Sequence, residues 1–460
     1  MENFKTIIET LYPMHAYLLG AGYDNRLEYL KHLLKLDILE FKSGTEFGTW
    51  TVPEEWIIRD AWVKDPQGNK IIDFQIEPLC VATGSVPFKG KVTKDELMKH
   101  LHYYNDFGDG NPDVTPYKTY YYNKDWAFCV PKNKVKAQLV KSDCDECEPE
   151  LKAFDPEVGK VSFDGNKPAQ TVDRLEEGEY EVFIDSEYKP GTMKIGVHTI
   201  PGKLDREILL FAHLDHPFQA NDNLSSVACL VGLATKIKSD HTIKIIFCPE
   251  TIGSQAYAYT QDLSKIDFVI AVECCGSNGP IQLLKSWNPN EKINRVAHCA
   301  LQIMGKSYKK GPFRANIGSD ETVFNDPLIG IQGLDISRWP YKEYHTAWDT
   351  PDKINYEMII ETSDLIQKII EIWDKDYVPI RNWKGTLFRS KYELHSPSKQ
   401  LNLNYDYFFY NIDGKRSLAE LCADFELNFD FIYDKFKQLQ EDGKISGLNT
   451  GKGPIKSPFV

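Results

Sequence analysis

Apolar runs alternate with helical periodicities through the middle of the chain. Residues 208–212, 243–248 and 268–272 have the length and β-branched content of buried strands. Residues 223–236 and 352–373 instead carry apolar side chains at helical spacing. Alternating strands and helices predict a doubly wound α/β domain with a mixed, mostly parallel sheet.

The chain changes character between residue 47 and about residue 165. Short aromatic and β-branched runs are punctuated there by Pro and Gly, which predicts a small β-rich module. Its aromatic residues could line a substrate cleft, but such residues more often form the core of a small β fold. Before the module, leucines at helical spacing in residues 1–43 predict helices that pack on the central domain. After it, residues 179–184 and 192–200 predict the first strands of the central sheet.

The C-terminal region predicts a separate small unit. Residues 417–425 and 428–442 each place apolar side chains on one helical face, and a turn follows at residues 443–445. This order indicates a winged helix. The second helix carries mainly acidic side chains, so contacts with DNA phosphates would contribute little to its binding affinity. We therefore expect it to act as a lid or to bind a protein partner, including a second copy of the chain, rather than DNA.

Composition and charge narrow the class of protein. A net charge of −13 argues against nucleic-acid binding. No apolar run approaches the roughly 18 residues of a membrane span. Charges at residues 2, 5 and 9 interrupt any signal-peptide core, so we expect a cytoplasmic protein. Ten cysteines in 460 residues do not indicate a disulfide framework. Cys144 and Cys147 form a single CxxC pair with acidic neighbours, which predicts a solvated loop rather than a metal or redox site.

Candidate chemistry gathers at the ends of the predicted strands. His213 and Asp215 end the first run, and Asp222 follows in the next loop. Ligands of an open parallel sheet bind beyond the carboxyl ends of its strands, and zinc takes imidazole and carboxylate ligands. Asp215 could orient His213 by accepting its second ring N–H. Two further strand ends carry carboxylates and a histidine precedes a long helix, namely Glu250, Glu273 and His345.

The order of these motifs resembles the zinc-dependent aminopeptidases of the bacterial leucyl aminopeptidase and glutaminyl cyclase superfamily. The supporting patterns are HxD, NDN, an acid after each of two strands, SD and YHTxxDT. Longer stretches are FGTWTVPEEWIIRDAW from Phe47, PETIGS from Pro249, GSDE from Gly318 and EYHTAWDT from Glu343. The resemblance implies a catalytic domain, an inserted protease-associated-like module and a C-terminal winged helix. Their expected extents are 1–45 with 166–380, then 46–165, and finally 381–460.

The resemblance also implies a role for each side chain. The implied metal ligands are His213, Asp222, Glu273 and His345. Asp222 bridges if there are two ions. Glu273 then binds the first metal and His345 the second. Glu250 is implied to be the base that activates water. The chain departs from the family at Thr251, because the family usually has a second glutamate there. Either Glu250 is the base and the second position lacks a ligand, or Glu250 is the ligand and the base is missing. The number of zinc ions, one or two, therefore remains open.

Substrate choice is expected to depend mainly on residues 313–338. In the resembled superfamily this region lines the site, where carboxylates can hold a substrate amine and an arginine or an aromatic face can meet a carboxylate or a sugar ring. A loop held by internal salt links is the alternative interpretation. The candidate substrate-binding residues are Ser319, Asp320, Glu321, Arg338 and Tyr344.

The function predicted from these residues is metal-assisted amide hydrolysis of the aminopeptidase type, with Glu250 moving the proton and Asp215 assisting. A peptide, peptide-like or amino-sugar substrate with a free amine is expected. One alternative is a single-zinc cyclase or acyltransferase like the glutaminyl cyclases. Another is a non-catalytic module that binds a peptide or a glycan.

Overall fold

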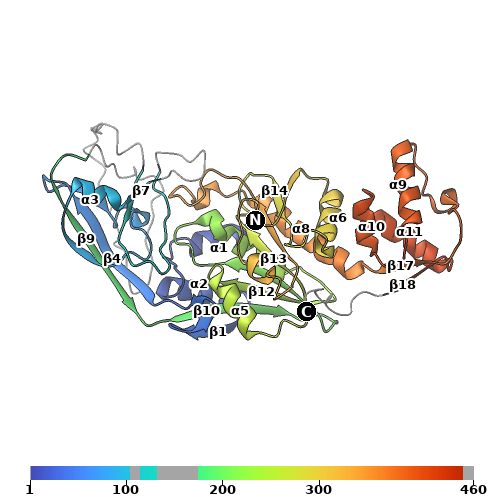
Figure 1. Cartoon of the computed structure of the whole chain (residues 1–460), viewed down its shortest axis with the longest axis horizontal. Coiled ribbons are helices and arrows are strands. Elements are labelled where there is room, and N and C mark those ends of the chain that lie inside the picture. The colour runs from blue at the N-terminus through green and yellow to red at the C-terminus, as the bar shows by residue number, and fades with distance from the viewer. Residues whose placement is uncertain (1, 104–113, 132–174, 449–460) are drawn as a thin grey trace.

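The computed structural model describes residues 2–103, 114–131 and 175–448, which form three units along its long axis (Figure 1). The middle unit is built on an eight-stranded sheet. In spatial order its strands are β1 (Asp37–Lys42), β10 (Thr192–Ile200), β12 (Thr242–Cys248), β11 (Glu207–His213), β13 (Ile266–Glu273), β16 (Gly333–Arg338), β14 (Ile281–Leu284) and β15 (Tyr308–Gly311).

The centre of this sheet is parallel. Strands β12, β11, β13 and β16 run in one direction, whereas β10 pairs antiparallel with β12 and β14 pairs antiparallel with β16. The mixed, mostly parallel sheet predicted from the sequence is thus confirmed. Strand β11 lies between β12 and β13, so the chain leaves it first to one side and later to the other. Such a switch point opens a crevice at the carboxyl ends of the strands.

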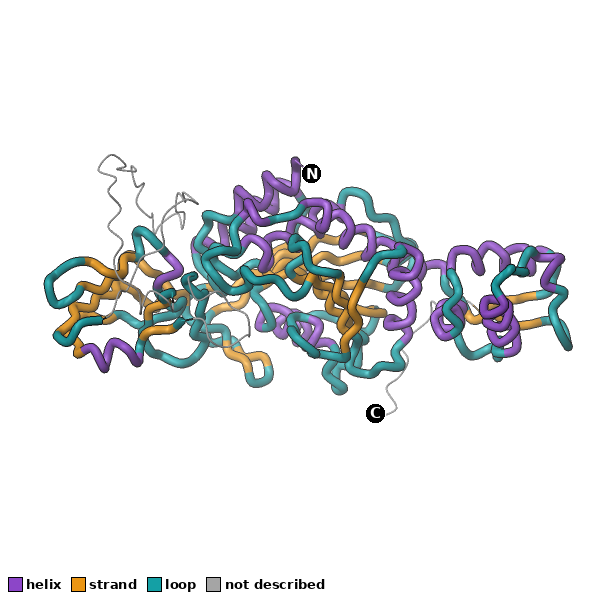
Figure 2. The backbone as a smooth tube through the Cα atoms, turned by 90° about the horizontal axis from the view of Figure 1, so that it is seen from above, coloured by secondary structure: helices purple, strands orange, loops and turns teal. Residues whose placement is uncertain are grey.

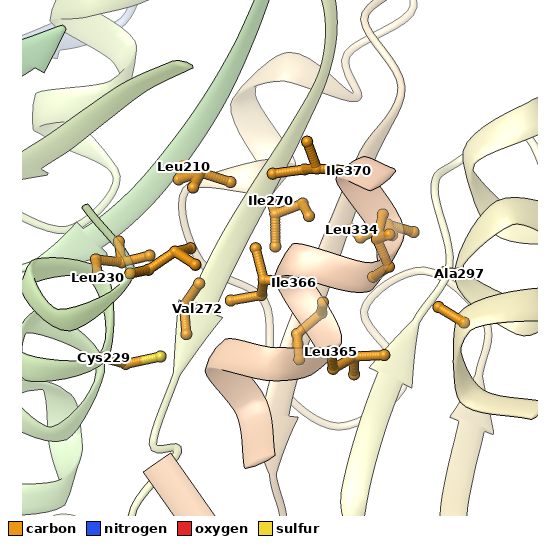
Figure 3. Close-up of a cluster of buried hydrophobic side chains, with 14 of the residues drawn as sticks. Leu210, Cys229, Leu230, Ile270, Val272, Ala297, Leu334, Leu365, Ile366 and Ile370 are labelled. Atoms are coloured by element: carbon orange, nitrogen blue, oxygen red, sulfur yellow. The ribbon is translucent and has the colours of Figure 1, made fainter. Parts of the chain in front are cut away.

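Helices cover both faces of the sheet. Helices α1 (Glu2–Leu11), α4 (Ser226–Ala234), α8 (Tyr356–Lys375) and α6 (Lys292–Met304) lie on one face. There Leu210, Ile270 and Ile366 belong to one buried apolar cluster (Figure 3). The opposite face packs against α5 (Ile252–Thr260) and α7 (Glu321–Phe324). The strands are therefore buried on both sides, which explains their nearly continuous apolar sequence.

The N-terminal region differs from its prediction at one point. Helices α1 and α2 (Ala21–Leu33) lie within the predicted helical region, but residues 37–42 form β1 at the edge of the sheet. Helix α2 packs Leu27 and Leu30 into the same apolar cluster as the sheet.

The small β-rich unit is a four-stranded antiparallel sheet in the order β5 (Lys70–Asp73), β4 (Glu55–Lys64), β9 (Glu179–Lys189) and β6 (Phe88–Thr93). Helix α3 (Lys94–Lys99) and the short pairs β2 (Glu46–Phe47) with β3 (Trp50–Thr51) and β7 (Leu101–His102) with β8 (Phe128–Cys129) complete it.

Strand β9 corrects a prediction, because residues 179–184 were expected in the central sheet. Burial alternates along β9, with Tyr180, Val182 and Ile184 facing inward. Such alternation suits an antiparallel sheet with one solvated face. Trp56 and Trp126 are buried in this unit and form part of its core.

The C-terminal unit contains α9 (Lys399–Tyr410), α10 (Leu418–Asp424), α11 (Phe429–Glu441) and the antiparallel pair β17 (Val378–Arg381) and β18 (Ile445–Leu448) (Figure 2). Ser417 begins α10 with a capping box to Glu420, and Asn428 caps α11. These local signals explain why both helices lie where the sequence predicted them. Cys144 and Cys147 fall outside the described residues, and no helix in the described ranges has the length and apolarity to cross a membrane.

Candidate metal centre

Three predicted side chains meet at the carboxyl edge of the sheet. His213 and Glu273 are the last residues of the neighbouring parallel strands β11 and β13, and Asp222 follows in the loop before α4. The Nε2 atom of His213 lies 3.1 Å from Oδ1 of Asp222 and 3.1 Å from Oε2 of Glu273. All three side chains are buried. We call this group the inner position.

A second group shares Asp222. Its Oδ2 atom lies 2.9 Å from Nε2 of His345 and 3.2 Å from Nδ1 of His216. The sequence predicts a metal-binding role for His345 but assigns no role to His216. Two features of the sequence could have indicated this role for His216. It is the second histidine of the stretch His213-Leu214-Asp215-His216, and Thr251 stands where the resembled family has a second acidic ligand. We call His216, Asp222 and His345 the outer position.

Both groups have donor atoms suited to zinc. Tetrahedral zinc with bonds of about 2.0–2.1 Å separates its ligand atoms by about 3.3 Å. The measured separations around Asp222 are 2.9 to 3.2 Å. Within each group the nitrogen and oxygen atoms lie within 4.8 Å of one another. The residues present therefore fit zinc at either group, and the two groups share Asp222.

Two buried carboxylates hold the loops that carry these groups. Asp215 lies 3.6 Å from Nδ1 of His213, an ion-pair distance, and accepts a hydrogen bond from the Glu250 N–H at 2.9 Å. Asp349 accepts from the N–H groups of Asn221 and Asp222 at 2.6 and 3.0 Å. Asp215 thus positions both a ligand and the candidate base, while Asp349 positions the shared ligand.

Glu250 is the accessible acid of the centre. Its side chain is 27% exposed, compared with 3% for Asp222 and 4% for Glu273. It follows the end of β12, and its Oε2 atom lies 3.5 Å from Nε2 of His216. Glu250 can therefore reach a substrate that the other acids cannot.

Three residues at the centre have left-handed backbone conformations that non-glycine residues rarely adopt. Thr251 has φ 61°, Cys274 has φ 47° and His345 has φ 51°. Each is a predicted site residue or follows one directly. Backbone strain of this kind costs of order 1–3 kcal/mol per residue and clusters at functional sites.

The inserted unit braces the outer position. The Tyr117 N–H donates to the His345 carbonyl at 2.7 Å, and the Ala347 N–H donates to the Thr115 carbonyl at 2.9 Å. The Tyr117 ring packs edge-on against His216 and His345, with centroids 5.3 and 5.2 Å away. The unit therefore contributes to the wall of the centre.

Charges at the centre compensate one another. Burial raises the pKa of Glu273 to about 8, although His213 opposes this shift. Burial would also raise the pKa of Asp222, but the surrounding imidazoles, His216 foremost, hold it well below its usual value. Conversely, burial would lower the pKa of His216, and Asp222 raises it to about 10. A divalent cation would take the place of the protons that these groups share.

Four of the five predicted substrate residues are turned inward. Ser319, Asp320 and Glu321 are buried, and Asp320 accepts a hydrogen bond from the Thr251 N–H at 2.9 Å. Arg338 is also buried and pairs with Glu361 at 2.9 Å, so its charge is already neutralised. The alternative interpretation, a loop held by internal links, describes this region better.

Tyr344 remains at the site, because its ring stacks on His345 with centroids 3.9 Å apart. Next to the centre lies a cavity of about 380 Å³. Its lining includes Asn221, Tyr341, Glu343 and Asp349. Cavities of this size accept small ligands.

The sheet, its helices and the position of the centre define an aminopeptidase-like α/β protein. A zinc aminopeptidase from Bacillus subtilis shares the fold, with a TM-score of 0.55 and 14% identity over 80% of this chain and 93% of its own. The chain belongs to the family described as the domain of unknown function DUF4910, whose model matches residues 5–376.

Two of the matches come from Clostridium acetobutylicum. One is named as a candidate polysaccharide biosynthesis protein with an aminopeptidase-like domain. It is 30% identical over 371 residues, which are 79% of this chain and 76% of the relative. The other is the crystal structure of a candidate peptidase, with 27% identity, a TM-score of 0.74 and coverage of 97% of this chain and 96% of its own.

Proposed function

We propose that the protein is a zinc-dependent hydrolase that cleaves an amide bond next to a free amine in a peptide, peptide-like or amino-sugar substrate. One observation carries this proposal. Two groups that each contain histidine share Asp222, and the accessible carboxylate of Glu250 lies beside them. The names of the Clostridium relatives, a candidate peptidase and a candidate polysaccharide biosynthesis protein, are compatible with both substrate classes.

His213, Asp222 and Glu273 would hold an ion at the inner position, and His345 and Asp222 would hold one at the outer position. When bound, zinc supplies a Lewis acid that polarises a carbonyl and lowers the pKa of water. The chain supplies the proton transfer. Glu250 takes a proton from the attacking water through its carboxylate and returns it to the leaving nitrogen. Asp215 keeps Glu250 in place through its backbone N–H.

The free amine of the substrate needs a carboxylate near the centre. Because Asp320 and Glu321 are buried, we assign this role to Glu343, which lines the neighbouring cavity. Tyr341 lines the same cavity and packs edge-on against Tyr344, so these rings would contact a side chain or a sugar ring of the substrate. The predicted acid is thus replaced by one from the loop that precedes His345.

The test compares hydrolysis of aminoacyl amides, dipeptides and N-acylated amino sugars by measuring released amine. Wild type should lose turnover in a zinc chelator and recover it with added zinc. Glu250→Gln should lower turnover by about 100-fold or more while its zinc content stays unchanged. The surface variant Glu54→Gln serves as the control. A zinc-loaded Glu250→Gln enzyme with nearly full turnover, or a zinc-loaded wild type inactive on all three classes, would reject the proposal.

A further inference from the structure

His216 lies buried between two carboxylates. Its Nδ1 atom is 3.2 Å from Oδ2 of Asp222, and its Nε2 atom is 3.5 Å from Oε2 of Glu250. Its Nδ1 atom, Oδ2 of Asp222 and Nε2 of His345 are all buried, yet none makes a hydrogen bond within the described chain. Buried polar atoms are nearly always paired. Three buried atoms that converge without a hydrogen bond are therefore suited to bind one cation in common.

We propose that His216 is the third protein ligand of a cation at the outer position, binding through Nδ1 together with Asp222 and His345. The three donor atoms lie within 4.8 Å of one another. The opposite ring nitrogen faces Glu250, and a metal-binding histidine usually donates its second N–H to a carboxylate. This inference shares with the proposed function only the requirement for a cation at this centre.

A competing grouping joins His216 to His213 and Asp215. That grouping would need Nδ1 of His213, which faces Asp215, while Nε2 of the same ring already faces Asp222 and Glu273. Asp215 also receives the Glu250 N–H. Asp215 is thus engaged in orienting its neighbours, and the outer position is the better assignment for His216.

The assignment makes the two positions chemically different. The inner position has one imidazole and two carboxylates, whereas the outer position has two imidazoles and the shared carboxylate of Asp222. Nitrogen ligands favour zinc and cobalt over magnesium and manganese. Glu250 is then not required as a ligand. One of its oxygens faces the His216 ring, and its partly exposed carboxylate remains available for proton transfer. Of the two roles left open for Glu250 by the threonine at position 251, the assignment favours the base over the ligand.

The test uses the full chain loaded with cobalt(II), whose content is measured by elemental analysis and whose ligands are identified by absorption spectroscopy. Wild type should hold about two ions per chain and His216→Ala about one. His216→Cys should regain the second ion and add a thiolate-to-cobalt absorption band absent from wild type. His198→Ala, a change at a histidine of β10 that contacts Lys35, should match wild type.

Two results would overturn the proposal: an unchanged cobalt content in His216→Ala, or a His216→Cys protein without the new band. The ion retained at the inner position reports that His216→Ala is folded, and the cysteine variant decides the question if the alanine variant does not fold. Turnover is not used as a readout. A chain that binds two ions as described but hydrolyses nothing would support this proposal and reject the proposed function.

Discussion

A single buried arginine holds the segment that carries His216. The guanidinium of Arg26 in α2 donates to the carbonyls of Leu214 and His216 at 2.8 and 2.9 Å, and to those of Leu11 and Met14. It is 1% exposed, and burial lowers its pKa to about 9. Because its donors meet carbonyl groups from two segments, it ties the N-terminal region to the metal centre.

We expect Arg26→Met to lower the free energy of unfolding by about 3 kcal/mol, because buried carbonyls lose their donors. It should also weaken zinc retention, since the His216 backbone is released. Thermal melting and dialysis against a chelator measure the two effects. Arg59→Met, a change at an arginine with a 41% exposed side chain, is the matched control. A variant that melts and retains zinc like wild type would show that Arg26 is dispensable.

Elements at the opposite edge of the sheet are joined by a partly buried charge network. His241 lies just before β12, with Nδ1 2.5 Å from Asp374 of α8 and Nε2 2.9 Å from Asp267 of β13. Arg206 also binds Asp267. A cavity of about 910 Å³ borders His241 and Asp374, far from the metal centre in the strand direction. This network fastens α8 to the sheet.

The network predicts a pH dependence of stability. Burial would lower the pKa of His241, but Asp267 and Asp374 outweigh it and raise the value from 6.5 to about 9. Because the pKa of His241 is higher in the folded state, its protonated form stabilises the fold fully at pH values below the unfolded pKa. This contribution to the free energy of unfolding is lost as the pH rises through about 9. Melting temperatures should therefore fall between about pH 6.5 and 9, and less steeply in His241→Gln. His32→Gln, at an exposed site, should keep the wild-type slope.

At the scale of the whole molecule, the C-terminal unit shares its core with the central domain. Helix α10 packs on α6, and the Cys299 thiol contacts the Ala419 carbonyl at 3.4 Å. One apolar cluster runs from Leu210 in the sheet to Phe436 in α11. We therefore expect this unit and the central domain to unfold together.

Ala419→Glu tests this expectation. A charge at this fully buried position should cost several kcal/mol and lower the melting temperature in a single transition. Calorimetry measures the number of transitions. Tyr407→Glu, at a 57% exposed site on α9, should melt like wild type. A separate early transition that leaves the main one unchanged would mean that the C-terminal unit is an independent domain.

Helix caps and the residues at strand ends could be predicted from the sequence. Parallel strands end at one edge of a sheet, so the sequence could predict that His213 and Glu273 lie at the same edge. The pairing of β11 with β13 then makes the two residues neighbours. Ser417 and Asn428 begin their helices through bonds to residues three positions away. For these two caps the determining contacts are local, because they join residues that are close in the chain.

Other features depended on contacts between distant segments. A half-buried alternating strand suits more than one sheet, so only its pairing with β4 and β6 assigned β9. Glu361, which is only partly buried, pairs with Arg338 and turns it away from substrate. Arg26 and Tyr117, which are distant from His216 in the sequence, hold His216 at the centre. Hydrophobic periodicity determines which face of an element is buried. Which polar groups meet there is decided by packing, because each buried donor or acceptor must find its partner in space.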